Sequence, residues 1–142
     1  MAELLGQHRY QLDAKGRVAL PVKFREPFAE GAFLTLGEDG CLYAFPRPEW
    51  ERRREELRAG GRAGQASRAR ARMFFGNAER VDLDGQGRMV IPQKLRAQVA
   101  MGRDVVVLGV DDWLEIWPGG QWDRYEQQNA GAYTAGALDP GP

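Results

Sequence analysis

Short runs of alternating apolar and polar residues, each pair separated by a glycine-containing turn, occur twice along the chain. RYQLD and RVALP flank the turn AKG, and ERVDLD and RMVIP flank the turn GQG. This pattern predicts pairs of β-strands. Pro21 and Pro92 end the second strand of each pair and suit the first turn of a helix, so VKFREPF and QKLRAQVAM are predicted as short helices.

Two more strand-like runs follow each predicted helix. AFLTLG and CLYAFP flank the turn EDG, and DVVVLG and WLEIWP flank the turn VDD. Each half of the chain therefore has the predicted order β-β-α-β-β.

The second half repeats the first at an offset of 71 residues, which becomes 72 after one extra residue. At the first offset the matches are Arg9 with Arg80, Leu12 with Leu83, Asp13 with Asp84, Gly16 with Gly87, Arg17 with Arg88, Pro21 with Pro92, Lys23 with Lys94 and Arg25 with Arg96. Two copies are too few for an open solenoid, which needs about three, so a closed domain with pseudo-twofold symmetry is expected.

Four segments follow from this pattern: repeat 1 over residues 5–52, a helical arginine-rich linker over 53–76, repeat 2 over 77–120, and a C-terminal helix with a disordered tail over 121–142. PEWERRREELRAG and GGQWDRYEQQN are predicted helices whose Trp50 and Trp122 pack on the sheet. The linker either faces a partner or phosphate, or is a solvated connector. The small, polar tail AGAYTAGALDPGP is predicted to be disordered.

Neither repeat has enough strands to cover its own apolar face. We therefore predict that both contribute to a single β-barrel, a mainly β fold with flanking helices. The predicted core includes Leu12, Val18, Leu20, Leu83, Val90 and Ile91.

Composition excludes several classes of protein. The 142 residues are 43% hydrophobic, and no apolar run approaches the ~18 residues of a membrane span. The N-terminus lacks a secretory signal, so we expect a cytoplasmic protein without a membrane partner. One cysteine, Cys41, and one histidine, His8, leave no disulfide and no metal site, and we predict no cofactor.

Charge is balanced overall but not locally. The chain has 20 basic and 20 acidic residues. Residues 1–78 hold 14 basic and 10 acidic side chains, whereas residues 79–142 hold 6 and 10, so the N-terminal half is the basic one. A nucleic-acid role must therefore depend on local patches.

The repeated D-x-x-x-R turn is the strongest candidate for such a role. Gly16 and Gly87 permit positive φ, and Asp13 and Asp84 are placed to accept hydrogen bonds from turn amides, so these four residues shape the turns. Arg17 and Arg88 either pair with these aspartates as a rigid brace or present a planar guanidinium to phosphate or guanine. The sequence leaves both uses open.

The residues around the first turn favour nucleic acid as the partner. Between residues 9 and 25 the only acid is Asp13, and the basic residues beside Arg17 are Arg9, Lys15, Lys23 and Arg25. Lys23 and Arg25 could equally form a solvated face. The second turn has Gln86 at the position of Lys15 and should be the weaker contact. No base, nucleophile and metal converge in the sequence, so we expect neither an enzyme nor a small-molecule substrate.

The paired motifs LDAKGRVALP and LDGQGRMVIP, with DGCLYAFPRPEW and DDWLEIWPGGQW after them, resemble the MraZ family of bacterial proteins from about residue 4 to 129. The resemblance implies two AbrB-like (SpoVT-AbrB) units forming one swapped-hairpin, double-split β-barrel, assembled into a ring that we expect to be an octamer. It also implies a sequence-specific, nucleoid-associated transcriptional regulator that binds direct repeats in double-stranded promoter DNA of its own division and cell-wall gene cluster.

Carried over onto this chain, the family motif falls on Asp13 with Arg17, on Asp84 with Arg88, and on Lys15. The second family motif often has a lysine where this sequence has Gly85, which weakens the expected phosphate contact of the second turn. The alternative is a ring-forming protein-interaction scaffold without specific DNA binding.

Overall fold

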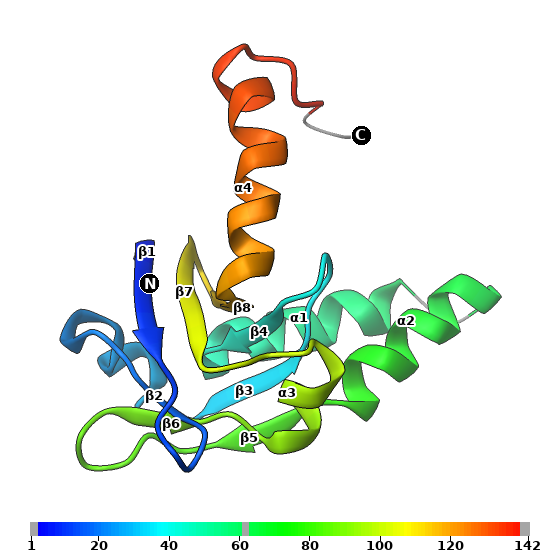
Figure 1. Ribbon diagram of the computed structural model, residues 1–142. Coiled ribbons are helices and arrows are strands. Elements are labelled where there is room, and N and C mark those ends of the chain that lie inside the picture. Colours follow the sequence, from blue (N-terminus) through cyan, green and yellow to red (C-terminus); the bar gives the residue numbers. More distant parts are fainter. Residues whose placement is uncertain (1–2, 61–62, 140–142) are drawn as a thin grey trace.

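Each repeat forms four strands with a short helical segment between the second and the third, and a longer helix after the fourth (Figure 1). The computed structural model describes residues 3–60 and 63–139. The elements of the first repeat are β1 (Leu4–Gln11), β2 (Arg17–Ala19), the 3-10 turns η1 (Val22–Phe24) and η2 (Glu26–Phe28), β3 (Ala32–Leu36), β4 (Leu42–Phe45) and α1 (Arg47–Ala59). Helix α2 (Gln65–Gly76) precedes β5 (Glu79–Val81), β6 (Arg88–Val90), α3 (Gln93–Gln98), β7 (Asp104–Asp111), β8 (Leu114–Pro118) and α4 (Gly119–Thr134).

The strands of the two repeats are interleaved. Strand β1 of the first repeat pairs antiparallel with β7 of the second, from Leu4 opposite Asp111 to Gln11 opposite Asp104. Strand β5 of the second repeat pairs in turn with β3 of the first, and β4 pairs with β8. The resulting six-stranded sheet has the order β1-β7-β8-β4-β3-β5, so each repeat completes the sheet of the other. The mainly β fold with two repeats and several helices is confirmed.

A second, two-stranded sheet joins the repeats through β2 and β6, with Val18 opposite Met89. Two main-chain hydrogen bonds extend it: Leu20 N–H donates to the Gly87 carbonyl at 3.0 Å, and Ile91 N–H donates to the Gly16 carbonyl at 2.8 Å. The D-x-x-x-R turns therefore lie at opposite ends of a short antiparallel ribbon. The described strands pair into these two sheets, and closure into a barrel stays a prediction.

A common core lies between the sheets and is built from both repeats. Of the predicted core residues, Leu12, Val18, Leu20 and Ile91 are buried, and Leu83 packs against them while partly buried. The prediction for Val90 was wrong, because Val90 is 39% exposed whereas Met89 is fully buried. Side chains alternate along β6, so Met89 points inward opposite Val18, and Val90 points outward opposite Arg17.

The helical segments differ from the prediction in two places. VKFREPF forms two 3-10 turns rather than one helix, because Pro27 has no N–H to donate. Helix α4 continues to Thr134, so the predicted disorder is wrong for residues 130–134. Gly136, at φ +70°, ends it in a Schellman-type cap with Ala137 N–H bonded to the Ala132 carbonyl at 2.8 Å. Residues 140–142 of the predicted tail and Arg62 of the linker lie outside the described residues.

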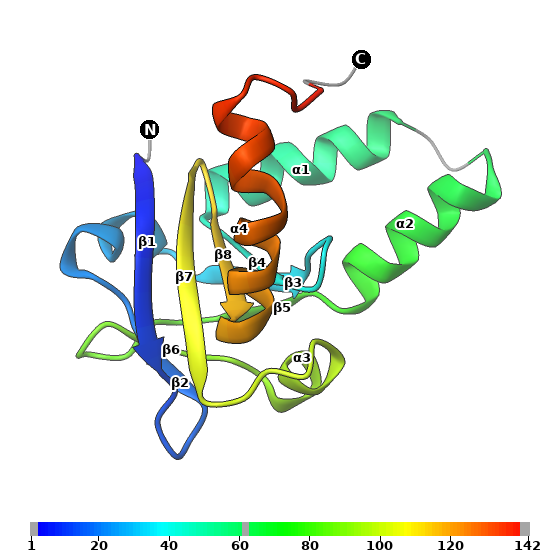
Figure 2. The same cartoon turned by 45° about the horizontal axis from the view of Figure 1, so that its top comes forward.

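The tryptophans of α1 and α4 pack on the outer face of the six-stranded sheet, as predicted. Trp50 stacks on Phe33, and Trp122 packs edge-on against Trp117, with ring centroids 5.1 and 5.2 Å apart. Phe74 of α2 also stacks on Trp50, so this arginine-rich helix is a packed element rather than only a solvated connector. Both views show α1 and α2 extending to one side and α4 standing away from the β2–β6 ribbon (Figures 1 and 2).

Every helix in residues 3–60 and 63–139 is too short or too polar to cross a lipid bilayer.

Candidate nucleic-acid interface

The two D-x-x-x-R turns have the same geometry. Asp13 Oδ1 accepts hydrogen bonds from the main-chain N–H groups of Lys15 and Arg17, both at 2.9 Å. Asp84 Oδ1 accepts from Gln86 and Arg88, again at 2.9 Å. Because a short carboxylate caps the turn from within, the chain reverses over three residues and enters the ribbon at a fixed angle.

A glycine is required at the same point of each turn for two reasons. Gly16 and Gly87 have φ of +74° and +73°, a region that disfavours side chains. In addition, a Cβ at Gly16 would lie 2.8 Å from the guanidinium carbon of Arg96, and a Cβ at Gly87 would collide with Arg25. The turns are therefore close-packed against arginines of the opposite repeat.

Arg17 and Arg88 are held by the aspartates of their own turns. The Nε–Oδ2 distance is 2.7 Å in both pairs. Arg17 Nη1 also lies 3.6 Å from Asp84 Oδ2, which links the two turns electrostatically. The arginine side chains remain 25% and 31% exposed, so each guanidinium is oriented by its aspartate and still reachable from solvent. In this arrangement each arginine can hold its turn in place and still donate hydrogen bonds to DNA.

The outer face of the β2–β6 ribbon carries both arginines. Val18 and Met89 point into the core, so Arg17, Ala19, Arg88 and Val90 lie on the opposite side of the two strands. Lys15 is exposed at the tip of the first turn, and Gly85 and Gln86 occupy the tip of the second. The ribbon thus presents two planar donor groups with a turn at each end.

The other two predicted DNA contacts lie outside the turns. Arg9, on β1, forms an ion pair of 2.5 Å with Asp123 of α4. Lys23, on η1, places its ammonium 5.4 Å from the centre of the Phe24 ring. The structure therefore groups Lys15, Arg17 and Arg88 and separates Arg9 and Lys23 from them.

Two arginines lie at turns to which the sequence did not assign them, and Arg25, which the sequence groups with the first turn, lies at the second. Arg25 follows β2 but lies against Gly87 of the second repeat, and Arg96 follows β6 but lies against Gly16 of the first. Arg25 Nε donates to the Leu20 carbonyl at 3.1 Å, and Arg96 Nε donates to the Ile91 carbonyl at 2.9 Å. The only signal in the sequence was their equivalent position in the two repeats, which does not reveal that they cross.

Hydrogen bonding makes both turn carboxylates stronger acids. The Arg88 N–H, followed by the Arg88 side chain and the Gln86 N–H, lowers the pKa of Asp84 from an ordinary value of 3.8 to about 2. The Arg17 N–H is the main cause of the lowered pKa of Asp13. Both aspartates are therefore ionised at neutral pH, and each compensates one arginine.

We expect acid to loosen the turns. A carboxylate whose pKa is lower in the folded state stabilises the fold above its unfolded pKa, and this stabilisation is lost as pH falls through the folded value. The melting temperature should be flat above about pH 5 and decrease between about pH 4 and pH 2. Thermal unfolding across this range checks the expectation, with Asp84→Asn as the control that removes one titrating group. Identical pH profiles for parent and variant would contradict the assignment.

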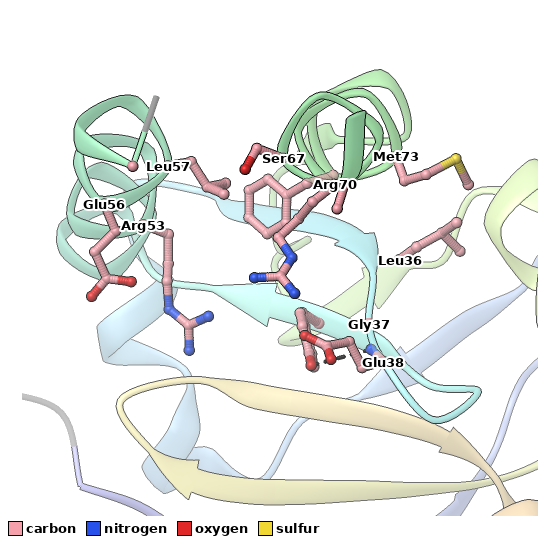
Figure 3. Close-up of a pocket in the computed structure, with 13 residues that line it drawn as sticks. Leu36, Gly37, Glu38, Arg53, Glu56, Leu57, Ser67, Arg70 and Met73 are labelled. Carbon is pink, nitrogen blue, oxygen red and sulfur yellow. Dashed lines mark hydrogen bonds between the residues drawn. The ribbon is translucent and has the colours of Figure 1, made fainter. Parts of the chain in front are cut away.

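A cavity of about 680 Å³ lies between helices α1 and α2 and the β3–β4 hairpin. Figure 3 shows Arg70 of α2 pointing into it toward Gly37 and Glu38 of the hairpin. Arg53 is already bonded to Glu49 at 2.9 Å, and Glu56 is bonded to Arg52. The described lining also includes Ser67, Met73 and Phe74.

Comparison with known proteins gives matches along nearly the whole chain. The model of the MraZ protein family, described as antitoxin-like, matches twice, over residues 4–73 and 74–137. The protein named "Transcriptional regulator MraZ" from Thermobifida fusca (strain YX) is 42% identical over 139 residues, covering 96% of this chain and 97% of that protein.

Proteins of the same name give similar matches in other bacteria. The one from Salinispora arenicola (strain CNS-205) is 45% identical over 121 residues, 85% of each chain. The one from Pelotomaculum thermopropionicum is 39% identical over 129 residues, 91% of this chain and 89% of that protein. The repeated family match and these identities give one conclusion: the chain belongs to the MraZ family.

Proposed function

We propose that this protein is a sequence-specific DNA-binding transcriptional regulator whose two D-x-x-x-R turns contact double-stranded DNA. The observation that carries the proposal is the ribbon between the repeats, which presents Arg17 and Arg88 outward with an aspartate-shaped turn at each end. A guanidinium with a fixed plane suits bidentate recognition of a base edge or a phosphate. The names of the relatives support a regulator rather than an enzyme.

Lys15, Arg17 and Arg88 are the central residues of this proposal, shaped by Asp13, Gly16, Asp84 and Gly87. Arg9 and Lys23 stay predictions of secondary phosphate contacts. We assign base recognition to Arg17 and Arg88, because their planes are fixed by the aspartates, and phosphate contact to the exposed ammonium of Lys15.

The finer parts of the proposal follow from the family resemblance. They are closure of the two sheets into one swapped-hairpin barrel, assembly into a ring of eight subunits, a cytoplasmic and nucleoid location, and action at direct repeats in the promoter of its own division and cell-wall gene cluster. A ring would let several weak turns bind repeated short sites together, which explains how a chain with zero net charge could bind DNA. Light scattering at micromolar concentration tests the assembly, and a monomer mass would exclude it.

Gel retardation tests the DNA proposal. The duplex is the DNA immediately upstream of the protein's own gene, and the control is a scrambled duplex of the same length and composition, both across a salt series. We expect tighter binding to the upstream duplex at every salt concentration and weakening of both complexes as salt increases. No retention of either duplex at low salt would instead favour the protein-interaction scaffold.

Lys15→Ala is expected to weaken binding to all duplexes by a similar factor. A phosphate contact carries no sequence information, so the ratio between upstream and scrambled DNA should not change. The slope of log Kd against log salt should become shallower by about 1 for each first turn in contact. Titrations at four or more salt concentrations give the slope, and a changed ratio at unchanged slope would assign Lys15 to base recognition instead.

A further inference from the structure

The second turn lacks the exposed lysine of the first, and the structure brings a different cation to it. Gln86 stands where the first turn has Lys15, and Gly85 precedes it. Arg25 reaches this turn from the first repeat, because β2 and β6 run antiparallel and the chain leaves β2 beside Gly87. The weakness expected from the sequence of the second turn is therefore offset by a side chain that is distant in sequence.

Arg25 is fixed to the ribbon through only part of its guanidinium. Its Nε donates to the Leu20 carbonyl at 3.1 Å, and the Leu20 N–H donates to the Gly87 carbonyl at 3.0 Å. Arg25 and the second turn are thus both hydrogen-bonded to Leu20, the residue that follows β2. In the part of the chain that the structure describes, no carboxylate pairs with the terminal nitrogens of Arg25.

The acids near the second turn are already compensated by other arginines. Asp82 lies 3.0 Å from Arg80, and Asp84 lies 2.7 Å from Arg88. Arg25, Asp82, Asp84 and Gly85 line a surface hollow of about 370 Å³ together with neighbouring residues. After these two ion pairs, Arg25 supplies the uncompensated positive charge of the hollow.

We propose that Arg25 is the phosphate-contacting cation of the second turn, supplied across the boundary between the repeats in place of a lysine in that turn. The inference rests on the proposed DNA-binding function. Arg96 is the symmetric counterpart at the first turn, where Lys15 already provides an exposed charge. Each turn is then built from both repeats. One repeat supplies the D-x-x-x-R arginine, and the other supplies Arg25 or Arg96.

The first test removes the charge with Arg25→Gln and measures the slope of log Kd against log salt on a scrambled duplex. We expect the slope to become shallower by about 1 for each second turn in contact with DNA. Arg54→Gln is the matched control, because Arg54 lies on α1 outside the turns and its side chain is 40% exposed. It should leave the slope unchanged.

The second test restores a charge at the tip of the turn. Gly85 has no atom within 4 Å of an added Cβ and no positive φ, so Gly85→Lys fits without strain. In the Arg25→Gln background this change is expected to return the slope to the parental value. A purely structural role for Arg25 predicts no such rescue.

If Arg25→Gln has a much lower melting temperature than the parent, Arg25→Lys keeps the proposal testable. It keeps the charge but not the planar fork, and we expect it to retain the parental slope even with a lower melting temperature. A folded Arg25→Gln with the parental slope, a lowered slope that Gly85→Lys does not restore, or equal loss in Arg25→Lys would overturn the inference alone. A parental chain that binds no duplex would overturn the proposed function and the inference together.

Discussion

A fragment of residues 1–60 is expected to show no cooperative unfolding transition as a monomer. It contains β1 to β4 and α1 but loses β7, β6 and β8, which are the partners of β1, β2 and β4. Only the β3–β4 pairing stays within the fragment, and an isolated hairpin is marginally stable in water. Circular dichroism during heating, with light scattering for the mass, should show a gradual change without a midpoint.

Complementation gives the control for this fragment. Residues 61–142 supply the missing strands, so co-expression with residues 1–60 should restore a cooperative transition in a one-to-one complex. The shared core, to which both repeats contribute buried residues, provides the cooperativity. A monomeric 1–60 fragment that unfolds with a sharp midpoint would contradict the interleaved fold.

Arg17→Ala is expected to abolish specific binding to the upstream duplex while leaving a folded protein. Loss of one bidentate base contact costs about 1 to 3 kcal/mol, and repetition around a multivalent assembly multiplies the loss. The turn itself should persist, because Asp13 still accepts the N–H groups of Lys15 and of residue 17. Gel retardation, the melting temperature and the oligomer mass should be measured on the same preparation.

Arg88→Ala is the equivalent change in the second turn, and it removes both a brace and a proposed base contact. Its Nε–Oδ2 distance of 2.7 Å equals that of the Arg17 pair, and Arg17→Ala also loses the 3.6 Å contact with Asp84. We expect the smaller loss of DNA binding from Arg88→Ala, because the first turn has two further cations, Lys15 and Arg96, whereas the second has Arg25 alone. Two results would contradict a DNA contact by Arg17: binding by Arg17→Ala that equals that of the parent, or a loss of binding that accompanies unfolding or dissociation of the protein. Arg17 would then only hold the turn together.

The local elements could be predicted because they depend on neighbouring residues. The doubled motif, the turns around Gly16 and Gly87, and the packing of Trp50 and Trp122 all follow from short-range patterns. The exposed Val90 shows the limit of such patterns. In RMVIP three apolar residues follow one another, and only the pairing of β6 with β2 decides which of them face the core.

The crossed arrangement could not be predicted, because strand partners are not encoded locally. The match of Arg25 with Arg96 indicates equivalent roles but not that each lies against the other repeat's turn. The ion pair between Arg17 and Asp84 depends on the same crossing. The candidate site therefore exists only after both repeats have folded together.

The central claim is that the turns touch DNA, and Lys15 reports on it most directly. The chain has three lysines, and Lys15 is the one at the tip of a turn. Lysine acetylation followed by mass spectrometry gives the reaction rate at Lys15 with and without the upstream duplex. We predict a slower rate in the complex that returns to the free value when salt dissociates it. An unchanged rate at Lys15, in a complex shown to form by gel retardation, would contradict the claim.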